Sequence, residues 1–178
     1  AAGAAAILLD LDTPGGRVDA AERIADAVRA SRIPVYAFVN PRAYSAGALI
    51  ALSTDGIYMR AGAVLGAATP VDGQGTKAPE KYVSAMRAEF RALAEEQGLD
   101  PRIAEAMVDE SLGAPGLAEP GQLVTLSTSE ALRVGYAKAE VNTEAEALAA
   151  AGLAGATIQL VELNWAELVV RFLTNPVV

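Results

Sequence analysis

The chain has 178 residues, 52% of them hydrophobic, and a formal charge of −8 at pH 7, which suits a single domain over residues 1–178 with one buried core. An acidic chain argues against nucleic acid as a partner, because phosphate binding needs a basic surface. The lack of cysteine and histidine excludes thiolate and histidine metal sites and a Ser-His-Asp triad, and we expect neither a metal nor a cofactor.

The first predicted elements form a strand-helix-strand unit, as in a parallel sheet. Residues 4–11 are almost continuously apolar, as in a strand covered on both faces. Pro-Gly-Gly at 14–16 is a turn in which the backbone can come close to another group. Residues 17–30 carry apolar side chains at helical spacing, and residues 35–39 form the second strand. We expect that strand to end in a turn at 40–41.

Ser45 lies between that turn and a short apolar segment, residues 46–52, which has the composition of a buried helix. A serine at a helix start is commonly an N-cap, and this stretch alone favours that interpretation. The alternative is chemical. A hydroxyl there lies beside unpaired backbone N–H groups and the positive end of the helix dipole, which stabilise negative charge on a substrate oxygen.

The longest helix pattern covers residues 80–97 and stops at Gly98. It follows two short predicted strands, at 55–59 and 63–68, and a polar, glycine-rich loop that continues to the helix. Lys81 falls in the first turn of this helix, where the dipole disfavours a cation. We therefore expect a lowered pKa for Lys81, as a catalytic base requires.

The remainder of the chain predicts several shorter elements. They are a helix over 100–112, a strand over 122–126, capped helices beginning at Ser127 and Thr143, a strand over 157–163 and an amphipathic helix over 164–178. The polar face of the last helix has one basic residue, so packing on the domain is favoured over a second copy or a membrane surface. The chain opens inside a strand-like run, and we expect that the natural first strand and a C-terminal membrane region lie outside it.

Four segments occur in an order that resembles one known family. They are DTPGGRVDAAERIADAV, PVYAFV, AYSAGALIAL and IYMRAGAVLGAATPV, followed by a lysine at the start of the next long helix. Together they resemble the NfeD-type membrane-bound serine proteases, also called stomatin-associated proteases, of the ClpP/crotonase superfamily. The resemblance extends over nearly the whole chain. It implies an α/β fold built as a ClpP/crotonase-like spiral of ββα units.

The same resemblance implies a Ser-Lys dyad in place of a triad. Ser45 matches the family's nucleophile and Lys81 its general base. Gly16, with Gly15 beside it, and the N–H of Ala46 match the oxyanion-hole donors. Such a base must be neutral, so its pKa has to fall well below the usual value of about 10.4.

Two other lysines are rivals for the base. Lys77 lies in the polar loop, where solvation would keep it charged, and Lys138 has the surroundings of a plain surface residue. Lys81 is therefore the first candidate for the general base and Lys77 the second. The apolar character of the site fits a lining by Leu49, Val64 and Leu65.

The family resemblance implies a serine endopeptidase that cleaves hydrophobic segments of a stomatin-like membrane partner and works as a homodimer. It would be membrane-anchored through segments absent from this chain, with the protease domain outside the cytoplasm and this fragment soluble. Two alternatives stay open. A crotonase-type acyl-CoA enzyme needs an acidic catalytic residue and a basic phosphate site, which a chain with three lysines offers poorly. A non-catalytic ClpP-fold scaffold for a membrane partner would use Ser45 only as a cap.

Overall fold

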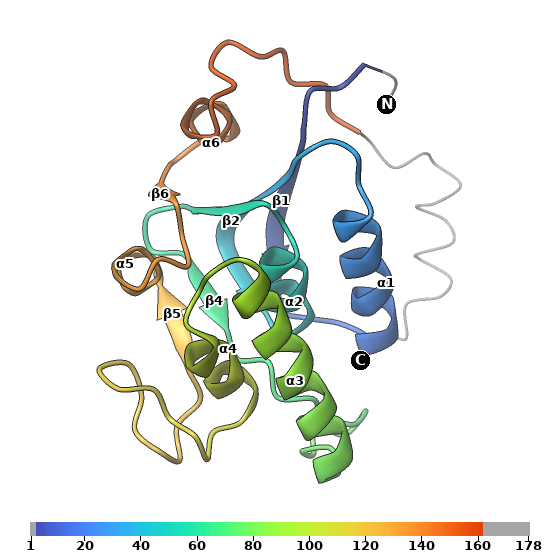
Figure 1. Ribbon diagram of the computed structural model, residues 1–178, viewed down its shortest axis with the longest axis vertical. Helices are drawn as coiled ribbons and strands as arrows, with labels where there is room; N and C mark the ends of the chain where they lie inside the picture. The colour runs from blue at the N-terminus through green and yellow to red at the C-terminus, as the bar shows by residue number, and fades with distance from the viewer. Residues whose placement is uncertain (1–2, 162–178) are drawn as a thin grey trace.

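The computed structural model describes residues 3–161, which form one curled sheet with helices packed around it (Figure 1). This confirms the predicted α/β class. The amphipathic helix expected at 164–178 lies outside the described residues. Within residues 3–161, no helix combines the length and apolarity needed to cross a bilayer.

The central strand of the sheet is the second one, β2, which pairs with three others. The strands are β1 (Ile7–Thr13), β2 (Val35–Tyr44), β3 (Gly56–Met59), β4 (Val64–Gly66), β5 (Thr125–Ser127) and β6 (Ala139–Glu140). Their order is β5-β4-β2-β3-β6, with β1 paired to β2, and every pairing except the antiparallel β4-β5 is parallel. The parallel arrangement brings the end of β1 beside the end of β2, where Ser45 follows.

The predicted end of β2 at residue 39 is wrong, because the strand continues to Tyr44. The register with β1 shifts between Leu11 and Thr13, so β2 bulges where Pro41 lies. A bulge tolerates a proline, whose missing N–H is not needed there. Beyond the bulge, pairing with β4 holds the strand extended as far as Ser45.

Two other strand predictions also differ from the structure. The first strand begins at Ile7, and none of its seven residues is buried, because β1 is an edge strand rather than one covered on both faces. Residues 157–161 are exposed and form no strand. An isolated extended segment gains nothing without a neighbouring strand to pair with.

Six helices follow the predicted pattern closely. They are α1 (Val18–Arg29), α2 (Ala46–Leu52), α3 (Glu80–Glu96), α4 (Pro101–Val108), α5 (Thr128–Arg133) and α6 (Glu144–Ala150). The Ser127 capping box and the Thr143 cap are confirmed. Helix α4 ends at Val108 instead of Leu112, because the Asp109 side chain accepts hydrogen bonds from the backbone and hydroxyl of Ser111 and so forms a turn.

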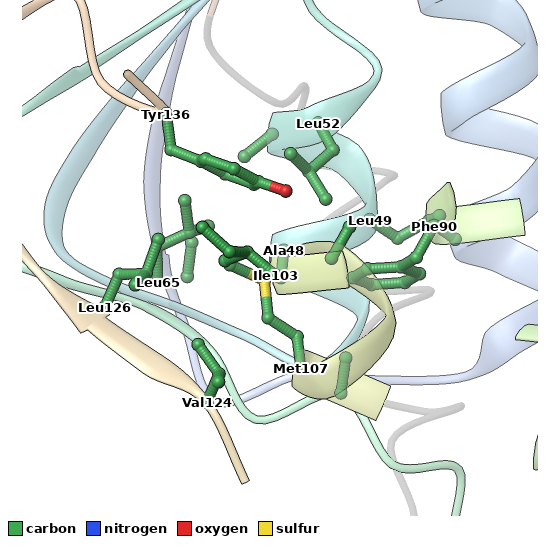
Figure 2. Close-up of a cluster of buried hydrophobic side chains, with 14 of the residues drawn as sticks. Ala48, Leu49, Leu52, Leu65, Phe90, Ile103, Met107, Val124, Leu126 and Tyr136 are labelled. Carbon is green, nitrogen blue, oxygen red and sulfur yellow. The ribbon is translucent and has the colours of Figure 1, made fainter. Parts of the chain in front are cut away.

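The hydrophobic core lies where α2 packs between the sheet and helices α3 and α4 (Figure 2). Leu49 and Leu52 of α2 meet Phe90 of α3 and Met107 of α4, and all four are almost completely buried. Because α2 is enclosed in this way, the position and direction of its first residue are fixed by the core. Ser45 is the residue that immediately precedes it.

Candidate active site

Ser45 joins the end of β2 to the start of α2 in an unusual backbone conformation, with φ 52° and ψ −116°. Its N–H donates to the Gly66 carbonyl at 3.0 Å, and its own carbonyl accepts from Ala48 and Leu49. Such a conformation is strained for a residue other than glycine and persists only where the surroundings enforce it. Within residues 3–161 the Ser45 side chain makes no capping hydrogen bond, so the cap interpretation accounts for its position but not for its hydroxyl.

Gly15 packs directly against Ser45. A Cβ at position 15 would lie 2.8 Å from Ser45 Cβ and 3.3 Å from its Oγ, and the φ of Gly15 is +120°. Thr13 holds this turn by accepting the Gly15 N–H at 3.1 Å. A Cβ at Gly47 would lie 2.5 Å from Thr13 Cγ2. The glycines of the Pro-Gly-Gly and Ser-Ala-Gly segments therefore allow β1, its turn and α2 to meet at Ser45.

The predicted oxyanion donors differ in what their N–H groups contact. The Gly15 N–H is already bonded to Thr13. In the described part of the chain, no acceptor engages the N–H of Gly16 or of Ala46. A Cβ at Gly16 would meet no atom within 4 Å, so this turn is open on its outer side. Gly16 and Ala46 thus keep the free donors that an oxyanion needs, whereas Gly15 supplies close packing.

Lys81 lies in the first turn of α3, as predicted, and its side chain is exposed. Its Nζ lies 4.8 Å from the centroid of the Tyr82 ring, a cation-π contact. No hydrogen bond or ion pair joins Lys81 to another residue within 3–161. Each of the two predicted dyad residues thus lies at the start of a helix, and within residues 3–161 no hydrogen bond joins their side chains.

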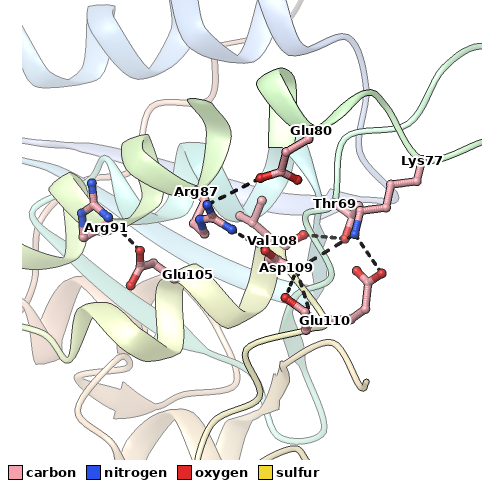
Figure 3. Close-up of polar contacts among 10 residues, drawn as sticks. Thr69, Lys77, Glu80, Arg87, Arg91, Glu105, Val108, Asp109 and Glu110 are labelled. Atoms are coloured by element: carbon pink, nitrogen blue, oxygen red, sulfur yellow. Dashed lines mark hydrogen bonds and ion pairs between the residues drawn. The ribbon is translucent and has the colours of Figure 1, made fainter. Parts of the chain in front are cut away.

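The rival lysines are placed differently. Lys77 Nζ lies 2.8 Å from a Glu110 carboxylate oxygen and 4.0 Å from one of Asp109 (Figure 3). The hydrogen bond to Glu110 raises the pKa of Lys77, which favours the charged form and disfavours a role as a neutral base. Lys138 is exposed and borders a hollow beside residues 52–55, at the opposite end of α2 from Ser45.

A partly buried ion pair between Arg87 and Asp109, which sequence reasoning did not identify, ties α3 to the segment after α4 (Figure 3). The Asp109 side chain is 7% exposed and accepts hydrogen bonds from Arg87 and from both the N–H and hydroxyl of Ser111. Burial raises the pKa of Asp109, but the bonds from Ser111 and Arg87 outweigh this and leave it below the usual range. Arg87 also lies 3.7 Å from Glu80 at the start of α3. Arg87 and Asp109 are 22 residues apart in the sequence, so no local sequence pattern predicts that they pair.

A small apolar pocket lies against Ser45. It is lined by Val18, Ala21, Ser45, Ala46, Leu49, Ala68, Pro70 and Met86. The pocket is narrow, since the centre of a water-sized sphere can occupy only about 10 Å³ of it. The expected lining is correct for Leu49, whereas Leu65 belongs to the core and Val64 pairs with Ser127 in the sheet. Within residues 3–161 no group of three or more metal-ligating side chains comes together.

A sequence profile described as "NfeD1b, N-terminal domain" matches residues 1–161. The chain belongs to this family. Membrane protein NfeD1b of Bacillus subtilis is 42% identical to it over 173 residues, which cover 97% of this chain and 40% of that protein. Membrane-bound protease PH1510 of Pyrococcus horikoshii is 38% identical over 117 residues, which cover 61% of this chain and 26% of that protein. The NfeD1b-type domain described here thus spans less than half the length of these relatives.

Solved structures give the same assignment. The domain is similar to a 1510-N membrane-bound stomatin-specific protease, solved as a lysine-to-alanine mutant with a substrate peptide, with a TM-score of 0.77 at 27% identity. That match covers 96% of this chain and 84% of the other. A serine-to-alanine mutant of 1510-N gives a TM-score of 0.70 at 32% identity, covering 83% and 69% of the two chains. These neighbours confirm the predicted ClpP-like fold of this domain.

Proposed function

We propose that this NfeD1b N-terminal domain is a serine endopeptidase that uses Ser45 as nucleophile and Lys81 as general base. Its substrates would be hydrophobic segments of a membrane-associated partner, such as a stomatin-like protein. Relatives named as proteases, one of them as stomatin-specific, support this class of reaction. Solved 1510-N structures in which a serine or a lysine is replaced by alanine are consistent with a Ser-Lys pair.

The observation that best supports the proposal is the strained backbone conformation of Ser45. A serine held at positive φ on a strand-to-helix turn, with a hydroxyl that makes no cap bond within residues 3–161, resembles the arrangement by which other hydrolases expose a nucleophile. A cap would need neither the strained conformation nor the close packing of Gly15. Strain of this kind is kept at positions where the chemistry requires it.

In the proposed reaction, neutral Lys81 Nζ accepts the Ser45 hydroxyl proton while Oγ bonds to the substrate carbonyl carbon. The carbonyl oxygen becomes an oxyanion and accepts hydrogen bonds from the N–H groups of Gly16 and Ala46. The protonated lysine then gives its proton to the leaving amine as the peptide bond breaks. Water, deprotonated by the same lysine, hydrolyses the resulting ester and frees Ser45.

For this chemistry, Lys81 must leave the Tyr82 ring and turn towards Ser45. Helix α3 borders the Ser45 pocket through Met86, and the segment before it borders the same pocket through Pro70. A lysine side chain is long and flexible enough to exchange a weak cation-π contact for a substrate-covered site. Burial beneath a peptide would also favour the neutral amine.

The test is a serine-directed phosphonylating probe applied across pH and read by intact mass and peptide mapping. We expect an adduct on Ser45 whose rate rises with pH, and loss of that rise in Lys81→Ala. Lys77→Ala is the matched control, since it removes a lysine four residues away that is engaged with Glu110, and should label like the wild type. An adduct on Ser45 that is unaffected by Lys81→Ala would remove the lysine from the mechanism.

A second candidate follows from the position of the Lys81 side chain. If its ammonium stays on Tyr82 with a substrate present, the domain is a ClpP-fold scaffold for a membrane partner, and Ser45 is chemically inert. The absence of any Ser45 adduct in the folded protein, with more than one probe, would favour this reading.

We also infer a membrane-anchored full-length protein, with the protease domain outside the cytoplasm and a homodimeric assembly. The names of the relatives, both membrane proteins, support the anchor. Sedimentation of the 178-residue chain tests the dimer, since a monomer at micromolar concentration would contradict it. Protease accessibility on intact cells tests the orientation, since protection of the domain would contradict it.

A further inference from the structure

The pocket beside Ser45 is too small for most side chains in its present form. It touches both Ser45 and Ala46, the proposed nucleophile and one of the proposed oxyanion donors. A carbonyl bound at these two residues would have its own side chain, on the acyl side of the cleaved bond, next to this pocket. The centre of a water-sized sphere can occupy only about 10 Å³ of this narrow hollow, so a small group such as a methyl fits it more readily than a bulky side chain does.

Met86 is the lining residue best able to change that volume. Ala21, Ala46 and Ala68 contribute only methyl groups, and Pro70 is rigid. Val18 also lines the pocket, but its β-branched side chain is short and restricted in χ1. Leu49 is 1% exposed and belongs to the central core. Met86, by contrast, is unbranched, has several rotatable bonds and is 8% exposed, and such a side chain adapts readily to what it packs against.

We propose that Met86 sets the size of the side chain accepted beside Ser45, and that the domain takes substrates with alanine or a residue of similar size at that position. This inference rests on the proposed function and adds a substrate class to it. An apolar segment rich in small residues fits the pocket directly. A leucine or phenylalanine fits only after the Met86 side chain has moved out.

The experiment uses two peptide phosphonate probes that are identical except for the side chain next to the reactive phosphorus, which is methyl in one and benzyl in the other. The rate of adduct formation on Ser45 is measured by intact mass for the 178-residue chain and its variants. In the wild type, the methyl probe should react roughly tenfold or more faster than the benzyl probe. In Met86→Ala, which removes the Cγ, Sδ and Cε atoms, the benzyl-to-methyl ratio should rise by about tenfold or more.

Leu93→Ala is the matched control. Leu93 lies on the same buried face of α3 and is 5% exposed, but it does not line the Ser45 pocket. It should lower stability comparably while leaving the ratio of the two rates unchanged. Met86→Val makes a smaller change and keeps the measurement possible if the alanine variant does not fold.

The outcomes separate the two proposals. Labelling of Ser45 with the same benzyl-to-methyl ratio in the wild type and both Met86 variants would overturn the role of Met86 and leave the proposed function standing. A wild type that prefers the benzyl probe would overturn the small-residue preference. No labelling of Ser45 by any probe in the folded protein would overturn the proposed function, and this inference with it.

Discussion

Replacing Gly15 with alanine would place a methyl group against the Ser45 side chain. The new Cβ would lie 2.8 Å from Ser45 Cβ, at a backbone φ of +120°, so either the turn or Ser45 has to move. Steric conflict and backbone strain of this kind together cost roughly 1–3 kcal/mol. For a domain of this size, that lowers Tm by about 2–4 °C per kcal/mol. Displacement of the nucleophile by about 1 Å costs on the order of a hundredfold in rate.

Thermal unfolding and the rate of Ser45 phosphonylation would be measured together for Gly15→Ala and Gly16→Ala. Gly16 is the control, because a Cβ there meets no atom within 4 Å and alanine keeps the backbone N–H. We expect Gly16→Ala to stay within about 0.5 kcal/mol of the wild type. If Gly15→Ala were as stable and as reactive as Gly16→Ala, the close packing of Gly15 on Ser45 would be refuted.

Three further predictions concern stability, each measured by urea denaturation. Gly47→Ala should lower the free energy of unfolding by roughly 1–3 kcal/mol. Adding Thr13→Ser removes the Cγ2 atom that lies 2.5 Å from the new Cβ, so the double variant should regain much of that stability. An equal loss of stability in the double variant would contradict the contact. Asp109→Asn should cost about 1–3 kcal/mol at pH 7 by weakening the bond to Arg87. Because the folded pKa of Asp109 is below its usual 3.8, its carboxylate contributes its full stabilisation above pH 3.8 and loses it as the pH falls through the folded pKa. A stability difference between Asp109→Asn and the wild type that stays constant under increasingly acidic conditions would contradict this. Ala67→Gly should raise the free energy of unfolding by about 0.5–1 kcal/mol, because Ala67 has φ 50°, a conformation that glycine adopts without strain. A lower free energy of unfolding would show instead that packing of the Ala67 methyl group dominates.

Helices and their caps were predictable because their signals are local. The periodicity of residues 80–97 and the Ser127–Glu130 pair act over a few residues, and both appear in the structure. Most of the errors arose where distant contacts decide, since pairing with β4 carries β2 past Pro41. The early end of α4 is a local exception, because the Asp109 side chain bonds to Ser111, two residues further on. The exposure of β1 likewise depends on its place at the sheet edge, which its own composition does not reveal.

The sequence could nominate members of the candidate site, but it could not give their geometry. Ser45 was identifiable from the strand, turn and helix around it, but its φ depends on packing with Gly15 and on the bond to Gly66. The choice between Lys77 and Lys81 is sharpened by Glu110, which is 33 residues from Lys77. Met86 has the pattern of an ordinary core residue, and only the folded chain brings it to the Ser45 pocket.

The first turn of α2 contains no acidic side chain, and its cap position lacks the usual side-chain hydrogen bond. Helix starts commonly gain about 1 kcal/mol from a cap and a few tenths more from a nearby carboxylate. A programme of thermostabilisation would therefore choose this turn early and place an aspartate there. That carboxylate would occupy the electrostatic field in which the proposed oxyanion develops. The stabilising carboxylate and the proposed oxyanion would bind to the same few backbone N–H groups at the start of α2. Selection for stability alone should therefore remove the proposed activity before it harms the fold.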